Sequence, residues 1–129
     1  MCLCHSKKPY DECCKRYHDG ALPEDALTLM RSRYSAYALS LADYVMQTTH
    51  QATHSADWRQ SILEFGQKTQ FESLAILDFA DDRERATVTF RAGLSESGRD
   101  VSFTEKSQFI KKGGRWLYVA AESEIVGRR

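Results

Sequence analysis

All four cysteines of the chain lie within its first fourteen residues, and this placement constrains the fold more than any other feature. They are Cys2, Cys4, Cys13 and Cys14, in the spacing C-x-C-x8-C-C. Two close pairs joined by a short loop can bring four sulfurs around one tetrahedral ion without a large core behind them. The spacing therefore predicts a structural Zn²⁺ knuckle whose four coordination positions are all filled by protein.

Two disulfides are an alternative to zinc, and the spacing argues against them. A bridge between Cys13 and Cys14, or between Cys2 and Cys4, would close a very small, strained ring. No apolar run follows Met1, so no secretory signal is expected, and cross-bridges between the pairs would be reduced in the cytosol. We therefore expect a cytoplasmic protein, in which free or redox-active thiols are the other alternative to zinc.

Basic and histidine side chains surround the cysteines in the sequence. Four thiolates on one divalent ion leave a net negative charge, which nearby cations can offset: Lys7, Lys8, Lys15 and Arg16. His5 and His18 are spare nitrogen ligands. Because the sulfur set is complete, we expect both histidines on the surface.

This spacing also resembles the SEC-C motif, a zinc knuckle found at the C-terminus of the translocation ATPase SecA and attached to many other bacterial proteins. The motif usually reads CPCGSGKxYxxC followed by Cys or His. The matching residues here are Ser6, Lys8, Tyr10, Cys13 and Cys14. The resemblance implies a zinc-held surface that docks on a protein partner, with Lys7, Lys8 and Tyr10 as its contact residues.

Three positions of the knuckle depart from the SEC-C pattern. Leu3, His5 and Lys7 stand where the motif has Pro, Gly and Gly. A residue other than glycine tolerates a positive φ poorly. We therefore expect a turn between the cysteine pairs that is less tight than in the motif.

Length and composition limit the rest of the chain to one core of ordinary size. The sequence has 129 residues, is 42% hydrophobic and contains no stretch long enough to cross a membrane. Its 18 basic and 18 acidic residues cancel, so non-specific attraction to nucleic acid is not a global property. We expect residues 1–20 to form the knuckle and residues 21–129 to form a single domain.

Helical periodicity dominates the first half of that domain. After Gly20 and Pro23, one stripe has spacings of three and four and is apolar or aromatic except at its end: Leu27, Met30, Tyr34, Tyr37, Leu41, Tyr44 and Thr48. This stripe predicts a long helix that faces a core. After a loop of Thr, His and Ser residues, Asp57 is expected to cap a shorter helix that Gly66 ends.

From about Phe71 the apolar period changes to two. Strands are expected within residues 71–79, 86–94, 101–109 and 115–121, with turns at Asp81-Asp82, Ser95 to Gly98 and Gly113-Gly114. Four consecutive strands joined by short turns predict a mainly antiparallel sheet. The two helices must bury their apolar sides against one face of that sheet, so we predict an α+β fold.

Four segments resemble the YchJ-like family of uncharacterised bacterial proteins. There, a SEC-C motif precedes LMRSRYxAY, a DYL-like pair, a T-x-H or TWHP segment and E-x-S-x-F. The corresponding segments here begin at Leu29, Asp43 and Glu105, and Thr49-His50 is a partial match to the third. The resemblance implies a nuclear transport factor 2-like cone, in which a bent sheet wraps a long N-terminal helix. Many members carry a second SEC-C motif, whereas this chain ends at Val126-Gly-Arg-Arg129.

Cones of this kind often enclose a pocket, which makes inward-facing polar residues informative. Glu105 alternates in phase with Phe103 and Phe109, so its carboxylate falls on the apolar face and needs a partner. One interpretation pairs it with Arg31, Arg33 or a tyrosine hydroxyl, or turns it outward at a β-bulge. The other makes Glu105 and His50 an acid–base pair in a pocket lined by Tyr34, Tyr37, Tyr44, Trp58 and Trp116.

Three functions follow from these features, and we rank them in order. The first is a non-enzymatic adaptor whose zinc knuckle docks on a protein partner. The second is a small-molecule binder, or a lyase-like or isomerase-like enzyme, that uses Glu105 and His50 in the cone. The third is binding of RNA or the ribosome through the basic knuckle.

Overall fold

The computed structural model describes residues 1–50 and 56–125 and has the predicted α+β fold. The helical half contains η1 (Tyr10–Glu12), α1 (Lys15–His18), α2 (Ala26–Ala38), α3 (Ala42–Gln47) and α4 (Ala56–Lys68). The strands are β1 (Gln70–Asp82), β2 (Arg85–Glu96), β3 (Arg99–Asp100), β4 (Phe103–Lys112) and β5 (Arg115–Ile125). Most of the predicted loop before Ala56, and the chain end from Val126, lie outside the described residues.

The strands form one antiparallel sheet in the order β1-β2-β4-β5, with the short β3 paired to β2. The turn between β4 and β5 lies at Gly113 and Gly114, as predicted, with φ angles of 59° and 81° that favour glycine. The first turn lies later than predicted. Asp81 and Asp82 still pair with β2, and the chain reverses only after them, at Arg83 with a φ of 31°.

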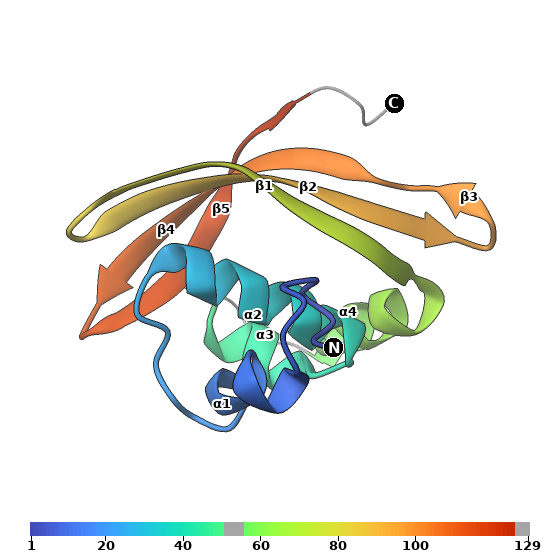
Figure 1. Ribbon diagram of the computed structural model, residues 1–129, viewed down its shortest axis with the longest axis horizontal. Coiled ribbons are helices and arrows are strands. Elements are labelled where there is room, and N and C mark those ends of the chain that lie inside the picture. The colour runs from blue at the N-terminus through green and yellow to red at the C-terminus, as the bar shows by residue number, and fades with distance from the viewer. Residues whose placement is uncertain (51–55, 126–129) are drawn as a thin grey trace.

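Irregular register bends the sheet over the helices, as Figure 1 shows. The pairing of β1 with β2 shifts between Phe71 and Ser73 and again between Ile76 and Asp78. The pairing of β4 with β5 shifts twice as well. Such bulges increase local twist and bend a strand. The helices therefore lie together on one concave face of the sheet.

The stripe from Leu27 to Thr48 occupies two helices rather than one. α2 ends at Ala38, where Ser40 N donates to Tyr37 O at 3.1 Å and Leu41 N donates to Ala36 O at 2.8 Å. This pair of hydrogen bonds is a Schellman motif, and Ser40 takes its left-handed position with a φ of 60°. α3 then starts in a new direction and keeps Tyr44 and Val45 buried.

The predicted second helix is longer than expected. α4 has 13 residues, as many as α2, and Asp57 lies in its first turn instead of preceding it. Gly66 does not end the helix. A Cβ at Gly66 would lie 2.4 Å from Tyr37 O, so this glycine lets α4 pack closely against the end of α2.

Two hydrophobic clusters form the core. The larger one joins residues of α2, such as Leu29 and Met30, to the sheet and also contains three cysteines of the knuckle, Cys2, Cys4 and Cys14. The smaller one joins α3 and α4 to the far side of α2. The knuckle therefore packs into the same core as the cone.

Candidate functional site

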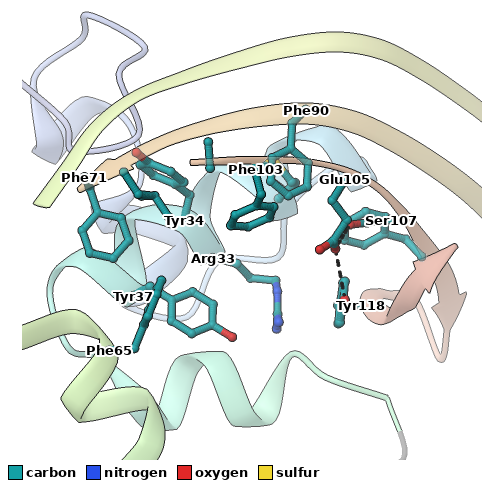
Figure 2. A pocket seen from close by; sticks show the side chains of 14 residues that line it. Arg33, Tyr34, Tyr37, Phe65, Phe71, Phe90, Phe103, Glu105, Ser107 and Tyr118 are labelled. Atoms are coloured by element: carbon teal, nitrogen blue, oxygen red, sulfur yellow. Dashed lines mark hydrogen bonds between the residues drawn. The ribbon is translucent and has the colours of Figure 1, made fainter. Parts of the chain in front are cut away.

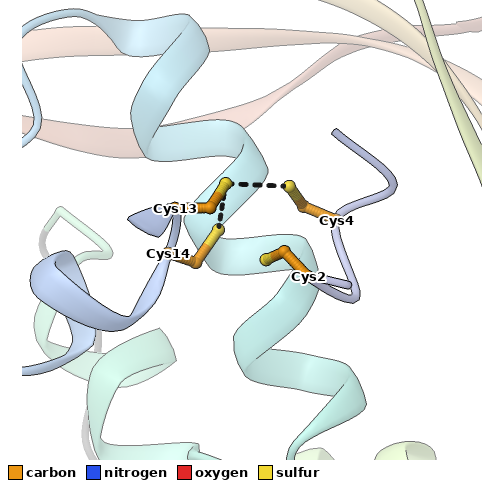
Figure 3. Close-up of side chains that lie close together, drawn as sticks. All are labelled: Cys2, Cys4, Cys13 and Cys14. Atoms are coloured by element: carbon orange, nitrogen blue, oxygen red, sulfur yellow. Dashed lines mark hydrogen bonds between the residues drawn. The ribbon is translucent and has the colours of Figure 1, made fainter. Parts of the chain in front are cut away.

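The four cysteines converge beside α2, as Figure 3 shows. Their sulfurs all lie within 4.8 Å of one another, with 3.6 Å between Cys4 and Cys13 and 3.9 Å between Cys13 and Cys14. No disulfide joins them, and all four cysteines belong to the described residues. A tetrahedral ion with Zn–S bonds of about 2.3 Å separates its sulfurs by about 3.8 Å. The donor set and the spacing fit such an ion.

The loop between the cysteine pairs is tight, so the looser turn expected from the sequence is wrong. Cys2 N donates to Lys8 O at 2.7 Å, and His5 N donates to Cys2 O at 3.1 Å. His5 and Lys7 adopt φ angles of 64° and 72° although neither is a glycine. The hydrogen bonds hold the backbone in a conformation that these side chains disfavour.

The thiols influence one another's ionisation. The pKa of Cys4 falls to about 4, chiefly because the Cys14 thiol donates a hydrogen bond to its sulfur. The same hydrogen bond raises the pKa of Cys14, because it stabilises the protonated thiol that donates it. Burial raises the pKa of Cys13. One of the four cysteines is therefore a thiolate at neutral pH. A cysteine must be in this form to bind a metal cation.

Hydrogen bonds fasten the inner side of the knuckle to β1 and α2 of the cone. His5 Nε2 donates to Phe71 O on β1 at 3.0 Å, and Arg31 Nη1 on α2 donates to Cys4 O at 3.1 Å. The Cys14 sulfur also lies 3.7 Å from Arg31 O. These bonds join residues that are up to 66 positions apart, so the knuckle and the cone hold each other in place.

His18 forms a further anchor, and its role differs from the surface position predicted for it. Its Nε2 donates to Ser32 O at 2.8 Å, which leaves Nδ1 to accept from Tyr10 OH at 2.7 Å. Burial lowers the pKa of His18 and favours this neutral form. Both ring nitrogens are engaged, so His18 is a structural link and not a metal ligand.

The outer face of the knuckle carries the predicted contact residues. Lys7 and Lys8 are exposed, whereas Tyr10 is half-buried with its hydroxyl on His18. Lys15 pairs with Asp19 at 2.6 Å on the surface. The structure therefore presents the two lysines to solvent and holds Tyr10 as part of the support beneath them.

A cavity of about 400 Å³ lies between α2, α4 and the sheet, and Figure 2 shows its side chains. Eight of the lining residues are aromatic: Tyr34, Tyr37, Phe65, Phe71, Phe90, Phe103, Phe109 and Tyr118. The others are Met30, Arg33, Ala92, Leu94, Glu105 and Ser107. The cone is therefore not filled completely by its own core.

Glu105 points into this cavity, as its strand alternation predicts. Its Oε2 accepts from Ser107 Oγ at 2.6 Å and from Tyr118 OH at 3.3 Å. Burial, and then the nearby Glu105 charge, raise the pKa of Tyr118 to about 12, so its hydroxyl stays protonated and can donate. Of the partners predicted for Glu105, the tyrosine hydroxyl is the one that the structure places in hydrogen-bond contact.

Arg33 is the cation of the cavity. Its Nη1 donates to Val45 O at 2.9 Å, Thr48 Oγ1 at 2.8 Å and Thr49 Oγ1 at 2.9 Å. Its guanidinium also lies 4.6 Å from the centre of the Tyr118 ring. Burial lowers the pKa of Arg33, but its ordinary value is so high that it stays charged.

The predicted pocket residues separate into different places. Tyr34, Tyr37 and Glu105 line the large cavity, whereas Tyr44 and Trp116 line another one of about 250 Å³ near α1.

Trp58 packs against the smaller hydrophobic cluster. His50 lines neither cavity among the described residues, and its buried Nε2 has no hydrogen-bond partner within that part of the chain. The structure therefore does not bring His50 into the cavity that holds Glu105.

Sequence reasoning missed most of the aromatic lining. Phe90 and Phe103 lie on inward faces of β2 and β4, and their alternation was recognised only as a core signal. Tyr118 likewise lies on the inward face of β5, on the opposite face of the strand from its neighbours Leu117 and Val119. Whether inward aromatic rings fill a core or line a cavity depends on the bend of the sheet, which has no local signal.

Comparison with known proteins identifies related chains. The profile of the family described as "YchJ, middle NTF2-like domain" matches residues 25–121. A UPF0225 protein of Enterobacter sp. (strain 638) is 36% identical over 122 residues, which are 92% of this chain and 80% of that protein. A UPF0225 protein of Bordetella pertussis is 38% identical over 122 residues, which are 92% of this chain and 89% of that protein.

Two solved structures share the fold. The solution structure of a SEC-C motif containing protein from Rhodopseudomonas palustris has a TM-score of 0.80 at 32% identity, over 95% of this chain and 97% of that one. The crystal structure of a SEC-C motif containing protein from Psychrobacter arcticus has a TM-score of 0.76 at 24% identity, over 98% of this chain and 84% of that one. Within the described residues, every helix is too short or too polar to cross a membrane.

Proposed function

This chain belongs to the YchJ family, and on that premise we propose that it is a zinc-binding, non-enzymatic adaptor whose knuckle docks on a protein partner. The observation that carries the proposal is the closed cysteine cluster: four protein sulfurs lie within 4.8 Å of one another and the same loop exposes Lys7 and Lys8. A site filled by four protein ligands is structural. Its function is then to fix the shape of the surface around it.

Zinc is the metal we propose because of the donor chemistry. Four thiolates in a tetrahedral set suit Zn²⁺, and a reducing, cytoplasmic compartment would keep these thiols available. When bound, the ion supplies folding free energy to a segment that has few apolar side chains of its own. The protein supplies the orientation, through Ser6 Oγ at 3.1 Å from Cys13 Sγ and through the backbone bonds of the loop.

The support beneath the loop favours a docking role. His5, Arg31 and His18 fasten the inner side of the knuckle to β1 and α2. Lys7 and Lys8 therefore project from a rigid base. A preorganised surface loses little conformational entropy on binding, which favours recognition of a partner.

The charge of the knuckle favours a protein over RNA. Residues 1–20 contain four basic side chains, but Asp11, Glu12 and Asp19 and the negative charge of a zinc tetrathiolate offset them. RNA binding relies on a clear excess of positive charge. Two exposed lysines on a knuckle without an excess of positive charge fit a partner with a small acidic patch of its own.

The enzymatic alternative is supported less well. An acid–base pair must reach one substrate, and the large cavity holds Glu105 without His50 among its described lining residues. The cavity has a second use that does not require catalysis, which is argued below.

A pull-down with charge-reversed variants tests the adaptor proposal. Tagged wild-type protein, K7E/K8E and C13S/C14S would each be incubated with lysate, with and without nuclease treatment, and captured proteins would be quantified by mass spectrometry. We expect a defined partner on the wild type that both variants lose. The matched control is K111E/K112E, because Lys111 and Lys112 are two adjacent exposed lysines at the distant end of β4.

Two outcomes would count against docking by the knuckle. The first is a partner that K7E/K8E retains, because the exposed lysines would then make no contact. The second is a partner that disappears on nuclease treatment, because RNA would then be the molecule recognised.

A further inference from the structure

The large cavity of the cone has the properties of a small-molecule site. Its volume of about 400 Å³ falls within the range of roughly 300–1,000 Å³ that is typical of such sites. It is lined mostly by aromatic rings, with a few polar groups gathered together. Its lining includes none of the four cysteines and neither exposed lysine of the knuckle, so the inference about it can be tested separately from the adaptor proposal.

The two ends of the cavity differ in chemistry. At one end Tyr34, Tyr37, Phe65 and Phe71 contact one another edge to face, with ring centroids 5.4–5.6 Å apart. Phe65 is 37% exposed and so marks the rim. At the other end lie Glu105, Ser107, Tyr118 and Arg33, as Figure 2 shows.

The charges at the polar end cancel. Arg33 contributes one positive charge and Glu105 one negative charge, and the Glu105 charge acts on the Arg33 guanidinium. A ligand with a net charge would leave that charge uncompensated among aromatic rings, which is costly. The cavity therefore favours an uncharged ligand.

Glu105 has an acceptor to spare. Both of its hydrogen bonds, from Ser107 and Tyr118, go to Oε2, and Oε1 accepts none within the described residues. Those two bonds also fix the orientation of the carboxylate. A ligand group that meets Oε1 must be a donor, and a hydrogen bond to a charged acceptor is stronger than one to a neutral acceptor.

We propose that this cavity binds a small, uncharged molecule with a planar aromatic body and one hydroxyl or N–H group that donates to Glu105. The aromatic body lies among Tyr37, Phe71 and Phe103, where offset and edge-to-face contacts are available. The donor group points towards the polar end. The Arg33 guanidinium stays bound to the C-terminal end of α3 and the residues just after it by its three hydrogen bonds, and it balances the charge of Glu105.

Four probes of similar shape separate the possible ligand classes. 2-Naphthol is an uncharged donor, and 2-methoxynaphthalene has no donor. 2-Naphthoate carries a negative charge, and protonated 2-(aminomethyl)naphthalene carries a positive one. Binding to the full chain would be measured by calorimetry and by chemical shift changes of cavity residues. We expect 2-naphthol to bind most tightly of the four.

Variants of Glu105 and of the cavity wall complete the test. In E105Q the advantage of 2-naphthol over 2-methoxynaphthalene should fall by about five- to tenfold, the difference between a charge-assisted and a neutral hydrogen bond. E84Q is the matched control, since Glu84 is exposed in the turn after β1. In A92F the added ring occupies the cavity, so all four probes should bind weakly while circular dichroism shows a folded sheet.

Each contrary result overturns the proposal. Tightest binding of 2-naphthoate would mean that Arg33 selects the ligand. Tightest binding of the ammonium probe would mean that a cation is recognised. An unchanged advantage of 2-naphthol in E105Q would remove Glu105 from recognition. No binding of any probe to the folded wild type would mean that the cavity closes in solution.

Discussion

Two residues of the knuckle loop occupy backbone conformations that suit glycine, although neither is glycine. His5 and Lys7 have positive φ angles, and the SEC-C pattern has Gly at both positions. The side chain of His5 offsets part of its strain through the bond to Phe71 O. No such contact is described for the Lys7 side chain. Substituting Lys7 can therefore relieve backbone strain without removing a hydrogen bond to the cone.

We predict that Lys7→Gly stabilises the metal-bound knuckle. Relief of a left-handed conformation is worth about 1–2 kcal/mol, and the greater freedom of glycine in the unfolded chain removes part of it. A net gain of up to about 1 kcal/mol remains, or a factor of about five in zinc retention against a competing chelator. Lys7→Ala loses the same charge but keeps a Cβ. Equal retention in the two variants would show that strain is not the cause.

The convergence of the four cysteines could be predicted at the residue scale, whereas the anchors of the knuckle could not. The four cysteines lie within fourteen residues, so their spacing alone predicts convergence. His5 and His18 were expected on the surface because the sulfur set is complete, but the structure bonds them to backbone carbonyls, Phe71 O and Ser32 O. A carbonyl of a distant residue leaves no signature in the sequence.

At the scale of elements, the apolar stripe predicted the buried face and hid the break between α2 and α3. The break depends on Ser40, which takes a left-handed position that is usually occupied by Gly or Asn. Gly66 was predicted to end a helix, but the helix continues through it. This glycine instead allows the close contact between α4 and α2. In both cases the deciding interaction was a backbone contact between elements.

Gly66→Ala is predicted to destabilise the protein, although alanine is the better helix former by about 1 kcal/mol. The new methyl group would lie 2.4 Å from Tyr37 O and force α4 away from α2. We expect a loss of about 2 kcal/mol or more, measured by urea unfolding. Gln60→Ala, at an exposed position of α4, is the control and should change little. A more stable Gly66→Ala protein would show that the two helices are not this close.

Arg33 joins α2 to the end of α3, and we predict that Arg33→Met costs about 2–4 kcal/mol of folding stability. The change removes three hydrogen bonds, two of them buried, and leaves Val45 O and two threonine hydroxyls with fewer partners. Arg59→Met is the control because Arg59 pairs with Asp43 on the surface, where ion pairs contribute little. Similar urea midpoints for both variants would contradict this role.

At the scale of the whole molecule, the knuckle and the cone share one hydrophobic cluster. Cys2, Cys4 and Cys14 pack with Leu29 and Met30 of α2. The sequence predicted both parts, because each has a local pattern. Their joint packing depends on the path of the chain between them, where Gly20 and Pro23 indicate only a break.

Loss of the metal is therefore expected to affect both parts unequally. In Cys13→Ser/Cys14→Ser, residues 1–20 should lose their order, because the proposed ion would provide most of the folding free energy of the knuckle. The sheet should stay folded but melt at a temperature several degrees lower, since α2 loses its packing contacts with the knuckle cysteines. Amide NMR spectra and thermal melts measure the two effects separately. An unchanged melting temperature would mean that the shared cluster contributes no stability.

The most direct test of the account is the intact mass of the natively purified protein under non-denaturing conditions, before and after a chelator. We predict one zinc ion per chain, lost on chelation together with the order of residues 1–20. Absence of metal with a mass lower by two pairs of thiol hydrogens would mean two disulfides. That result would contradict the zinc knuckle and remove the main support for the adaptor function.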